Sequence, residues 1–345
     1  MYSHNLNVNW LDQIFSKLPG KRKHLIPTIN YDPMQYCLDH FDAIPDDADT
    51  VILCMRDIWA LHGSNVLNHP KLANKKFFLA DLGYENRKLA AQQWQIPTHL
   101  FYFLSKKKIQ LHCKEPGLKH SYICLNNRAE FSRLVLGWRL WKADLLGDII
   151  FSQSEKGAWW AQENGREPNL VSQLPDFYDY CRLLPIRTEN DIKHEDIQLD
   201  WTVNHWGYQQ SYCNIVTETS TSDDIYNPQG SSKLLEIVSE KSYKPFAAGQ
   251  VPVFLACRGH IPCLQKQGFE TMDQELFGPG FDSLTAHDKI IAIVDLVKKG
   301  PKFMENFYFE HLREIKHNHE LFCSDRVDRL IMSNIDLFLQ EQGLV

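Results

Sequence analysis

The sequence has no pair of cysteines in a Cys-x-x-Cys spacing, no secretory signal and no apolar run near the roughly 20 residues that cross a bilayer. Its nine cysteines are odd in number, and several lie in apolar segments, such as Cys54 in VILCM and Cys257 in VFLAC. They are expected to be small core residues in a reducing compartment rather than a disulfide framework. We therefore expect a soluble, cytoplasmic protein with no transmembrane segment.

An excess of basic residues is also lacking. Lys and Arg number 37 against 43 Asp and Glu, for a net charge of −6. This balance argues against a protein whose main task is to bind a polyanion, although it is compatible with a local basic cleft. With 345 residues, 43% of them hydrophobic, the chain can form two medium-sized domains with ordinary cores.

Short apolar segments alternate with segments of helical spacing along the chain. In the first part, apolar runs lie at residues 49–55, 76–83 and 98–105, and residues 85–94 have helical spacing. A strand at 121–125, a helix at 131–141 and a strand at 148–152 follow. Apolar strands of this length that alternate with helices predict a parallel sheet covered on both faces.

The second half repeats this alternation and ends in helices. It predicts strands at 211–219, 251–257 and 269–271, helices at 239–249 and 260–268, and a helical tail from residue 285. Gly249 and Gly268 lie where a helix end needs a left-handed residue. The pattern predicts a two-lobed α/β protein with a helical C-terminal tail, divided into residues 1–150 and 151–345.

Two helix starts that follow predicted strands carry cationic residues, and ligands of open parallel sheets bind at such places. The residues are Asn126, Asn127, Arg128 and Arg133 at the first start, and Ser239, Glu240, Lys241 and Lys244 at the second. Free N–H groups and the helix dipole favour an anion, and a neighbouring carboxylate can accept hydrogen bonds from sugar hydroxyls. A nucleoside diphosphate needs both kinds of group.

A purely structural interpretation stays open for both helix starts. Ser239 can cap its helix, and Glu240 is then a favourable first-turn charge. Arg128 and Arg133 are also compatible with a solvated helix face.

The segment SEKSYKPFAAGQVPVFL resembles the donor-binding segment of the α1,3-fucosyltransferases and of fucosyltransferase-like glycosyltransferases from bacteria and phages. These proteins carry a Ser/Thr-Glu-Lys segment, a helix with small residues and glycine, and then a Val-Pro strand. The upstream SYCNIVTET and CLNNRAEFSRLVLGWRLWKADLL resemble their preceding strand and their Asn/Arg-rich turn. The similarity covers the central and C-terminal halves, and it departs in the turn, where relatives often have more arginines and a His-Arg pair.

The resemblance implies a GT-B architecture: two Rossmann-like lobes, an N-terminal acceptor-side lobe and a C-terminal lobe that binds the nucleotide sugar. It implies that Glu240 binds ribose hydroxyls and that Lys241 and Arg133 hold the diphosphate. Glu218 and Tyr243 are further candidates for donor contacts. The co-substrate would be a GDP- or UDP-linked sugar, with no other cofactor, and the acceptor a glycan or another hydroxyl compound.

A base for an inverting transfer is expected in the N-terminal lobe, because a carboxylate must deprotonate the acceptor hydroxyl. Asp57, Asp81 and Glu85 lie at or near strand ends there, although each also suits a structural turn.

No metal ligand is expected. The pair Asp47 and Asp49 has Asp-x-Asp spacing but precedes its strand, so we expect a solvated loop. His311, His317 and His319 have no matching Cys or Asp cluster and indicate a polar helical face.

The leading hypothesis is a metal-independent, inverting glycosyltransferase. Two alternatives stay open. One is a non-catalytic binding or scaffold protein that retains the fold, which the altered arginine turn and the lack of an evident base favour. The other is a phage-type DNA glycosyltransferase, against which the net charge of −6 counts.

Overall fold

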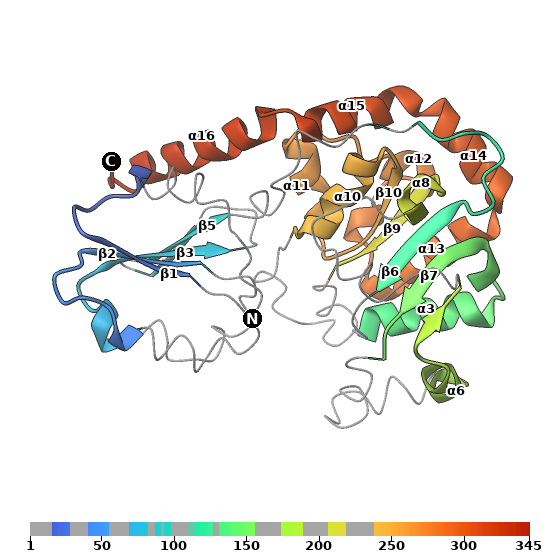
Figure 1. Cartoon of the computed structure of the whole chain (residues 1–345), viewed down its shortest axis with the longest axis horizontal. Helices are drawn as coiled ribbons and strands as arrows, with labels where there is room; N and C mark the ends of the chain where they lie inside the picture. The colour runs from blue at the N-terminus through green and yellow to red at the C-terminus, as the bar shows by residue number, and fades with distance from the viewer. Residues whose placement is uncertain are drawn as a thin grey trace. The chain divides into compact units, whose positions relative to one another are not determined.

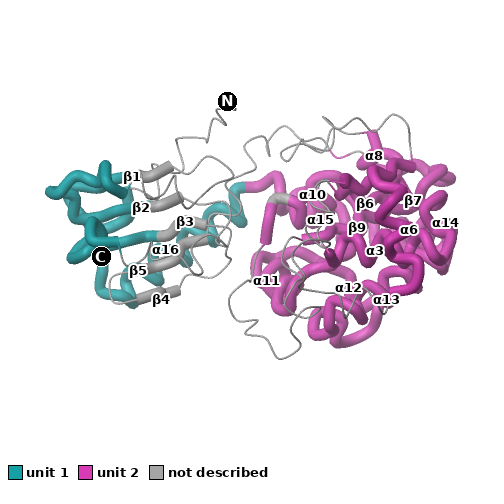
Figure 2. The backbone as a smooth tube through the Cα atoms, turned by 90° about the horizontal axis from the view of Figure 1, so that it is seen from below, with its two compact units in different colours: residues 1–104, 325–345 teal, residues 105–324 magenta. Residues whose placement is uncertain are grey.

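The protein is a mixed α/β structure with two mainly parallel, five-stranded sheets (Figure 1). The computed structural model describes residues 16–27, 41–54, 69–81, 87–90, 93–97, 111, 113–126, 131–155, 174–188, 206–218 and 238–345. Within these ranges, no helix has the length and apolar character that a membrane span requires. The chain divides into unit 1, residues 1–104 and 325–345, and unit 2, residues 105–324 (Figure 2).

Unit 1 contains the first sheet, in the order β1-β2-β3-β5-β4. Its strands are β1 (Lys23–Pro27), β2 (Thr50–Cys54), β3 (Lys76–Asp81), β4 (Arg87–Ala90) and β5 (Gln93–Pro97), and a 3-10 turn, η3 (Pro70–Leu72), precedes β3. All neighbouring strands are parallel except β4, which runs antiparallel to β5. Successive residues of β2 and β3 (Val51 and Ile52, Phe77 and Phe78) are buried, which indicates that both faces of this sheet are covered.

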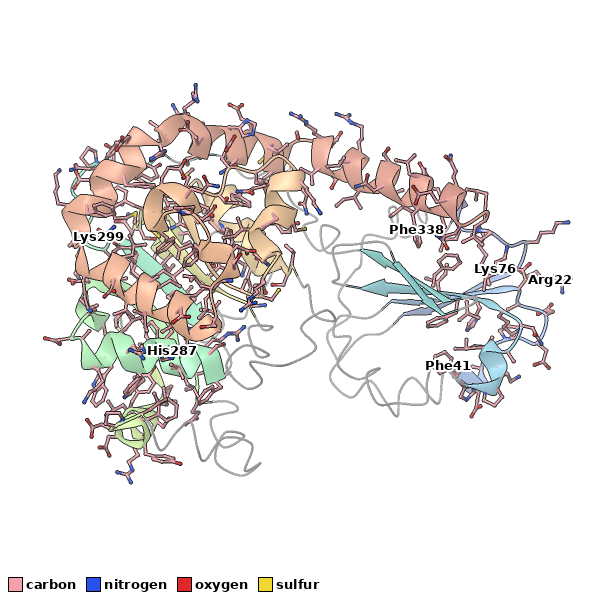
Figure 3. The ribbon with its side chains drawn as sticks, turned by 180° about the vertical axis from the view of Figure 1, so that it is seen from behind. Arg22, Phe41, Lys76, His287, Lys299 and Phe338 are labelled. Atoms are coloured by element: carbon pink, nitrogen blue, oxygen red, sulfur yellow. The ribbon has the colours of Figure 1, made fainter. Side chains whose placement is uncertain are left out.

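The last helix, α16 (Arg326–Glu341), belongs to unit 1. Its buried side chains recur every three to four residues: Val327, Ile331, Ile335, Phe338 and Leu339. This spacing places them on one apolar face, and Figure 3 shows Phe338 directed toward the sheet of unit 1. The Lys17 ammonium also contacts the Asp336 carboxylate at 2.5 Å. Residues from the end of the sequence therefore complete the core of unit 1.

Unit 2 contains the second sheet, in the order β10-β9-β6-β7-β8. Its strands are β6 (Tyr122–Asn126), β7 (Ile149–Gln153), β8 (Ile186–Arg187), β9 (Cys213–Thr217) and β10 (Val251–Leu255). β8 pairs antiparallel with β7, and the other pairs are parallel. Every residue of β7, β9 and β10 is buried, as expected for parallel strands covered on both faces.

Helices surround this second sheet (Figure 1). They are α3 (Phe131–Lys142), α6 (Phe177–Arg182), α8 (Trp206–Gln209), α10 (Glu240–Ala248), α11 (His260–Lys266), α12 (Asp273–Phe277), α13 (Ala286–Lys298), α14 (Pro301–Glu310) and α15 (Leu312–Cys323). Of two 3-10 turns, η6 (Leu146–Asp148) precedes β7 and η8 (Phe281–Ser283) lies between α12 and α13.

The strand register shows that α13 and α10 cover opposite faces. Tyr122 of β6 donates a hydrogen bond to the Leu296 carbonyl of α13, and it is aligned with Cys213 of β9. Phe254 of β10 packs against Phe246 of α10 and is aligned with Val216, three positions farther along β9. Because side chains alternate along a strand, Cys213 and Val216 point to opposite faces, and so do the two helices.

The structure confirms the expected strand–helix–strand segments around β6, α3 and β7, and around β9, α10 and β10. The predicted helix at 85–94 is wrong, because these residues contribute to β4 and β5. In Gln93–Pro97, polar and apolar residues alternate, which is the period of a strand that pairs with β3. The predicted strand at 269–271 is also absent. The run at 98–105 lies outside the described residues.

The two units differ from the expected division at residue 150. β6 is hydrogen-bonded to β9 as well as to β7, so the strand–helix–strand segment before residue 150 belongs to the sheet of unit 2. The helical tail also divides, because α16 belongs to unit 1 while α13, α14 and α15 belong to unit 2. Strand pairing between distant segments decides the first point and the packing of α16 decides the second, and local sequence patterns reveal neither.

Gly249 ends α10 in the left-handed conformation, with φ of 61°. A Cβ at this position would lie 2.3 Å from Leu111 Cδ1. We expect Gly249→Ala to lower the free energy of unfolding by about 1–3 kcal/mol, because it adds backbone strain and a steric clash. Gly147→Ala is the control, since a Cβ there meets nothing within 4 Å. Urea denaturation measures both, and equal effects would contradict the expectation.

Lys114 is a buried cation of unit 2, only 5% exposed. Its ammonium donates to the carbonyls of Tyr208 at 2.6 Å and Ala248 at 2.9 Å, in the last residues of α8 and α10. Carbonyls at a helix C-terminus carry partial negative charge, which favours a cation. Burial nevertheless lowers the pKa of Lys114 from 10.5 to about 8.

This lowered pKa predicts a pH dependence of stability. Between about pH 8 and pH 10.5 the unfolded chain retains the Lys114 proton and the folded chain does not, so this residue's contribution to the free energy of unfolding rises with pH. The difference between wild type and Lys114→Met should therefore increase by about 1–3 kcal/mol across this range. Urea denaturation at several pH values measures it, and a difference that stays constant or falls would contradict the prediction.

Candidate functional site

The carboxyl ends of β6 and β9 meet at the centre of the second sheet. From β6 the chain passes through α3 to β7 on one side, and from β9 it passes through α10 to β10 on the other side. In open α/β sheets, ligands bind outside the carboxyl ends of the strands where the connections diverge in this way. The polar side chains at these two strand ends therefore form the candidate site.

A hydrogen-bonded group joins the two strand ends on one face of the sheet. Thr217 Oγ1 donates to Asn126 Oδ1 at 2.5 Å, and Arg133 Nη2 of α3 donates to the Thr217 carbonyl at 3.0 Å. All three residues are buried, with Arg133 only 3% exposed. The expectation of a solvated helix face is thus wrong for Arg133, whose guanidinium brings positive charge to the carboxyl end of β9.

Glu218 lies directly after β9 and is fully buried. Its carboxylate accepts hydrogen bonds from the Ser239 N–H at 3.0 Å, from Ser239 Oγ at 2.7 Å and from Ser242 Oγ at 2.5 Å. Each of these partners is a donor, which is the surrounding that an ionised carboxylate requires. Glu218 therefore anchors the first turn of α10 to the end of β9.

The N-terminus of α10 is capped as expected, because Ser239 Oγ accepts the Lys241 N–H at 3.2 Å. The half-buried Lys241 side chain also turns back, so that its ammonium lies 3.3 Å from Ser239 Oγ. A helix N-terminus carries partial positive charge. The ammonium and the helix dipole thus place two sources of positive potential at the first turn of α10.

Tyr243 and Lys244 follow in the same helix and are buried. The Tyr243 hydroxyl donates to Gln267 at 2.9 Å, and the ring packs against Phe246, Phe269 and Phe322. Tyr243 is therefore part of the core of unit 2, and its hydroxyl already has a protein partner.

Several predicted site residues cannot be compared with the structure. Asp57, Glu85 and Arg128 lie outside the described residues, and so do the side chains of Asp81 and Glu240, whose backbones are in β3 and α10. Their roles stay predictions.

Ser242 and His260 are part of the site although the sequence did not single them out. Ser242 Oγ lies 3.0 Å from His260 Nε2 in the first turn of α11, and both residues are fully buried. Ser242 is three residues after the capping Ser239, a spacing that places both hydroxyls on one side of the helix. His260 gave no sequence signal, because only tertiary packing brings α11 to α10.

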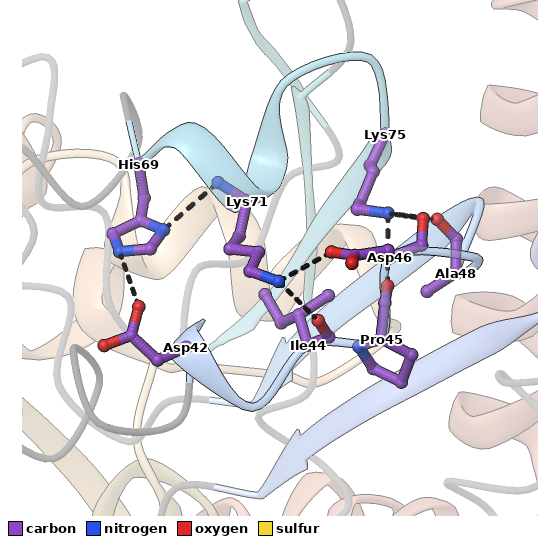
Figure 4. Close-up of polar contacts among 8 residues, drawn as sticks. All are labelled: Asp42, Ile44, Pro45, Asp46, Ala48, His69, Lys71 and Lys75. Atoms are coloured by element: carbon purple, nitrogen blue, oxygen red, sulfur yellow. Dashed lines mark hydrogen bonds and ion pairs between the residues drawn. The ribbon is translucent and has the colours of Figure 1, made fainter.

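The Asp-x-Asp pair of unit 1 is engaged by neighbouring groups. Asp49 accepts the Lys21 N–H at 2.9 Å, and Asp47 forms an exposed ion pair with Arg22 at 2.5 Å. Figure 4 shows the adjoining turn, where Asp46 pairs with Lys71 at 2.6 Å. These contacts hold the turn that precedes β2, and they give each of the carboxylates of Asp46, Asp47 and Asp49 a partner within the protein.

Three backbone carbonyls of the same turn surround the ammonium of Lys75, as Figure 4 shows. They belong to Pro45 at 3.3 Å, Asp46 at 2.9 Å and Ala48 at 2.5 Å. Among the described side chains, no three His, Cys, Asp or Glu residues gather as a metal site. His317 and His319 lie instead within 3.0 Å of the carbonyls of Gly268 and Ala247.

Comparisons of the chain with protein-family models, with curated proteins and with solved structures found no match. A functional assignment therefore depends on the sequence resemblance and on the geometry of the residues themselves.

The hydrogen bonds of Glu218 predict a large effect of losing its charge. In Glu218→Gln one side-chain oxygen becomes an NH₂ group that faces donors, so we expect the free energy of unfolding to fall by about 2–3 kcal/mol. Asp295→Asn is the control, because Asp295 forms an exposed pair with Lys298 and such pairs contribute at most about 1 kcal/mol. Urea denaturation measures both variants, and similar effects would argue against a charged network at Glu218.

Proposed function

We propose that the protein is a metal-independent glycosyltransferase that binds a nucleotide sugar at the carboxyl edge of the second sheet. The observation that carries this proposal is the first turn of α10, where a capped helix N-terminus and Lys241 are held at the diverging strand ends by buried Glu218. The same residues lie in the segment that resembles the donor-binding segment of fucosyltransferase-like enzymes. Geometry and resemblance thus indicate the same part of the chain.

A diphosphate suits the first turn of α10 for electrostatic reasons. The helix dipole favours an anion, and the Lys241 ammonium adds a full positive charge, while the Ser239 and Lys241 N–H groups already bond Glu218 and Ser239 Oγ. In the proposed complex Lys241 moves from Ser239 Oγ to the diphosphate, and Glu240 binds the ribose hydroxyls, as the resemblance implies. Arg133 does not contact the ligand in this proposal. Its buried guanidinium, bonded to the Thr217 carbonyl, adds positive potential at the carboxyl end of β9.

Glu218 has a different role in this proposal from the donor contact that the resemblance implies. Its carboxylate is fully buried and accepts hydrogen bonds from Ser239 and Ser242. It therefore holds the first turn of α10 in place rather than contacting the sugar nucleotide.

The proposed reaction transfers the sugar to an acceptor hydroxyl as negative charge grows on the leaving diphosphate. Donors aimed at that charge lower the barrier, and one well-placed donor contributes about 3–4 kcal/mol. A carboxylate must also take the proton of the acceptor hydroxyl. Asp57, Asp81 and Glu85 of unit 1 are the proposed candidates for this base, in a GT-B arrangement of two lobes that each contain a parallel sheet.

A non-catalytic nucleotide-binding module is the second candidate. The burial of Arg133 favours this second candidate. Its guanidinium is bonded to a main-chain carbonyl and is poorly placed to stabilise negative charge that develops on a leaving diphosphate. Such a module would bind the nucleotide and would not release it from a nucleotide sugar.

Nucleotide binding tests the proposal. In the presence of EDTA, at least one of the two nucleotides GDP and UDP is expected to raise the melting temperature of the wild type. Lys241→Ala should weaken that binding about 10-fold, because a charge-assisted contact is lost. Lys298→Ala, which removes an exposed lysine on α13, should respond like the wild type. An equal response of Lys241→Ala and wild type would remove the site assignment.

Turnover separates the two candidate functions. Release of the nucleotide from a GDP- or UDP-sugar, with and without hydroxyl acceptors, is expected for a transferase. Nucleotide binding without release across a broad panel of acceptors would instead identify a binding module.

A further inference from the structure

We propose that His260 is a positioning residue that makes anion binding at the first turn of α10 depend on pH. This inference rests on the proposed function, because it concerns the same first turn. It is carried by the contacts of Ser242, which connect the imidazole of His260 to the buried carboxylate of Glu218.

The hydrogen-bond directions follow from counting protons. Ser242 has one hydroxyl proton and two close neighbours, Glu218 Oε1 at 2.5 Å and His260 Nε2 at 3.0 Å. Glu218 also faces the N–H and the hydroxyl of Ser239, so the carboxylate accepts from all of these groups. Ser242 thus donates to Glu218 and can only accept from His260. The Nε2 atom of His260 therefore carries a proton.

Ser239 has a similar arrangement of hydrogen bonds at the same carboxylate. Its hydroxyl donates to Glu218 and accepts from the backbone N–H and the ammonium of Lys241. The single negative charge of Glu218 is consequently linked through one serine to Lys241 and through another to His260. The N-terminus of α10 bonds this carboxylate directly, whereas α11 is connected to it only through His260 and Ser242.

Protonation of His260 changes how the charge of Glu218 is balanced. With a neutral imidazole, Lys241 is the cation linked to this carboxylate through Ser239. An imidazolium supplies a second cation, so the Lys241 ammonium is held less strongly by the protein and the first turn of α10 becomes more positive. An anionic ligand should therefore bind more tightly as His260 takes up its second proton. Because His260 is fully buried, it acts through Ser242 and Glu218.

Other groups around His260 also act on its charge. Asp282 of η8 accepts the N–H groups of Gly259 at 2.6 Å and Ile261 at 3.2 Å, on either side of His260. The other charged groups on the described parts of these elements include Glu218, Lys241, Lys244, Arg258, Lys266 and Lys289, whose ammonium binds the Ala256 carbonyl. The two carboxylates favour the imidazolium, whereas the nearby cations and the full burial of His260 oppose it.

Calorimetry from pH 5.5 to 8.5 tests the inference. It measures the dissociation constant of GDP, or of UDP if only UDP binds. His260→Gln is the informative variant, because its amide N–H can still donate to Ser242 but does not titrate in this range. The wild-type constant should rise about 5-fold more than that of His260→Gln across the range, at the lower end of typical coupling between sites. Ionisation of the nucleotide is common to both proteins. His287→Gln, at an exposed position on α13, should follow the wild type.

A second measurement needs no ligand. An NMR titration of the His260 ring should show a proton on Nε2 and a lower pKa in Glu218→Gln than in the wild type, because the neighbouring negative charge is gone. An unprotonated Nε2, or an unchanged pKa, would overturn the inference.

The outcomes separate the inference from the proposed function. Nucleotide binding with the same pH dependence in wild type and His260→Gln would overturn the role of His260 and leave the proposed function standing. A wild type that binds neither nucleotide at any pH would overturn both.

Discussion

A buried carboxylate at the start of α10 is the interaction on which the candidate site depends. Removing a charged group from water costs several kcal/mol even after the protein relaxes. At Glu218 this cost is offset by the Ser239 N–H, by two hydroxyl groups and by the dipole of α10. These groups stabilise the charge only in one arrangement, so the carboxylate fixes where α10 begins relative to the end of β9.

The order of the strands explains why this charge lies at the strand ends. β6 and β9 are neighbours in space, but the chain leaves them toward opposite edges of the sheet. Alternation along β9 then sends Thr217 to the face of Arg133 and the following Glu218 to the face of α10. Two consecutive residues at the end of β9 thus lie near opposite charges. The Thr217 carbonyl binds the Arg133 guanidinium, and Glu218 carries the carboxylate that binds Ser239. A helix start that is held rigidly is well suited to bind an anion, since little ordering is left to the ligand.

Local patterns predicted much of this arrangement, whereas non-local contacts escaped prediction. The cap at Ser239 and the left-handed end at Gly249 depend on adjacent residues, and both were predicted from sequence. The burial of Arg133 and the contact of Ser242 with His260 depend on how α3 and α11 pack. The division of the chain into units escaped prediction for the same reason, because it depends on which strands pair. The bases proposed for catalysis stay predictions from sequence alone.

The return of α16 to unit 1 has a consequence for how the protein is made. Residues 1–104 emerge from the ribosome first, yet five buried side chains of their core come from residues 327–339. Unit 2 is contiguous in sequence and can complete its fold while α16 is still untranslated. The first-synthesised sheet therefore lacks the apolar face of α16 until the rest of the chain has been translated, and apolar surface exposed during that interval favours binding by chaperones.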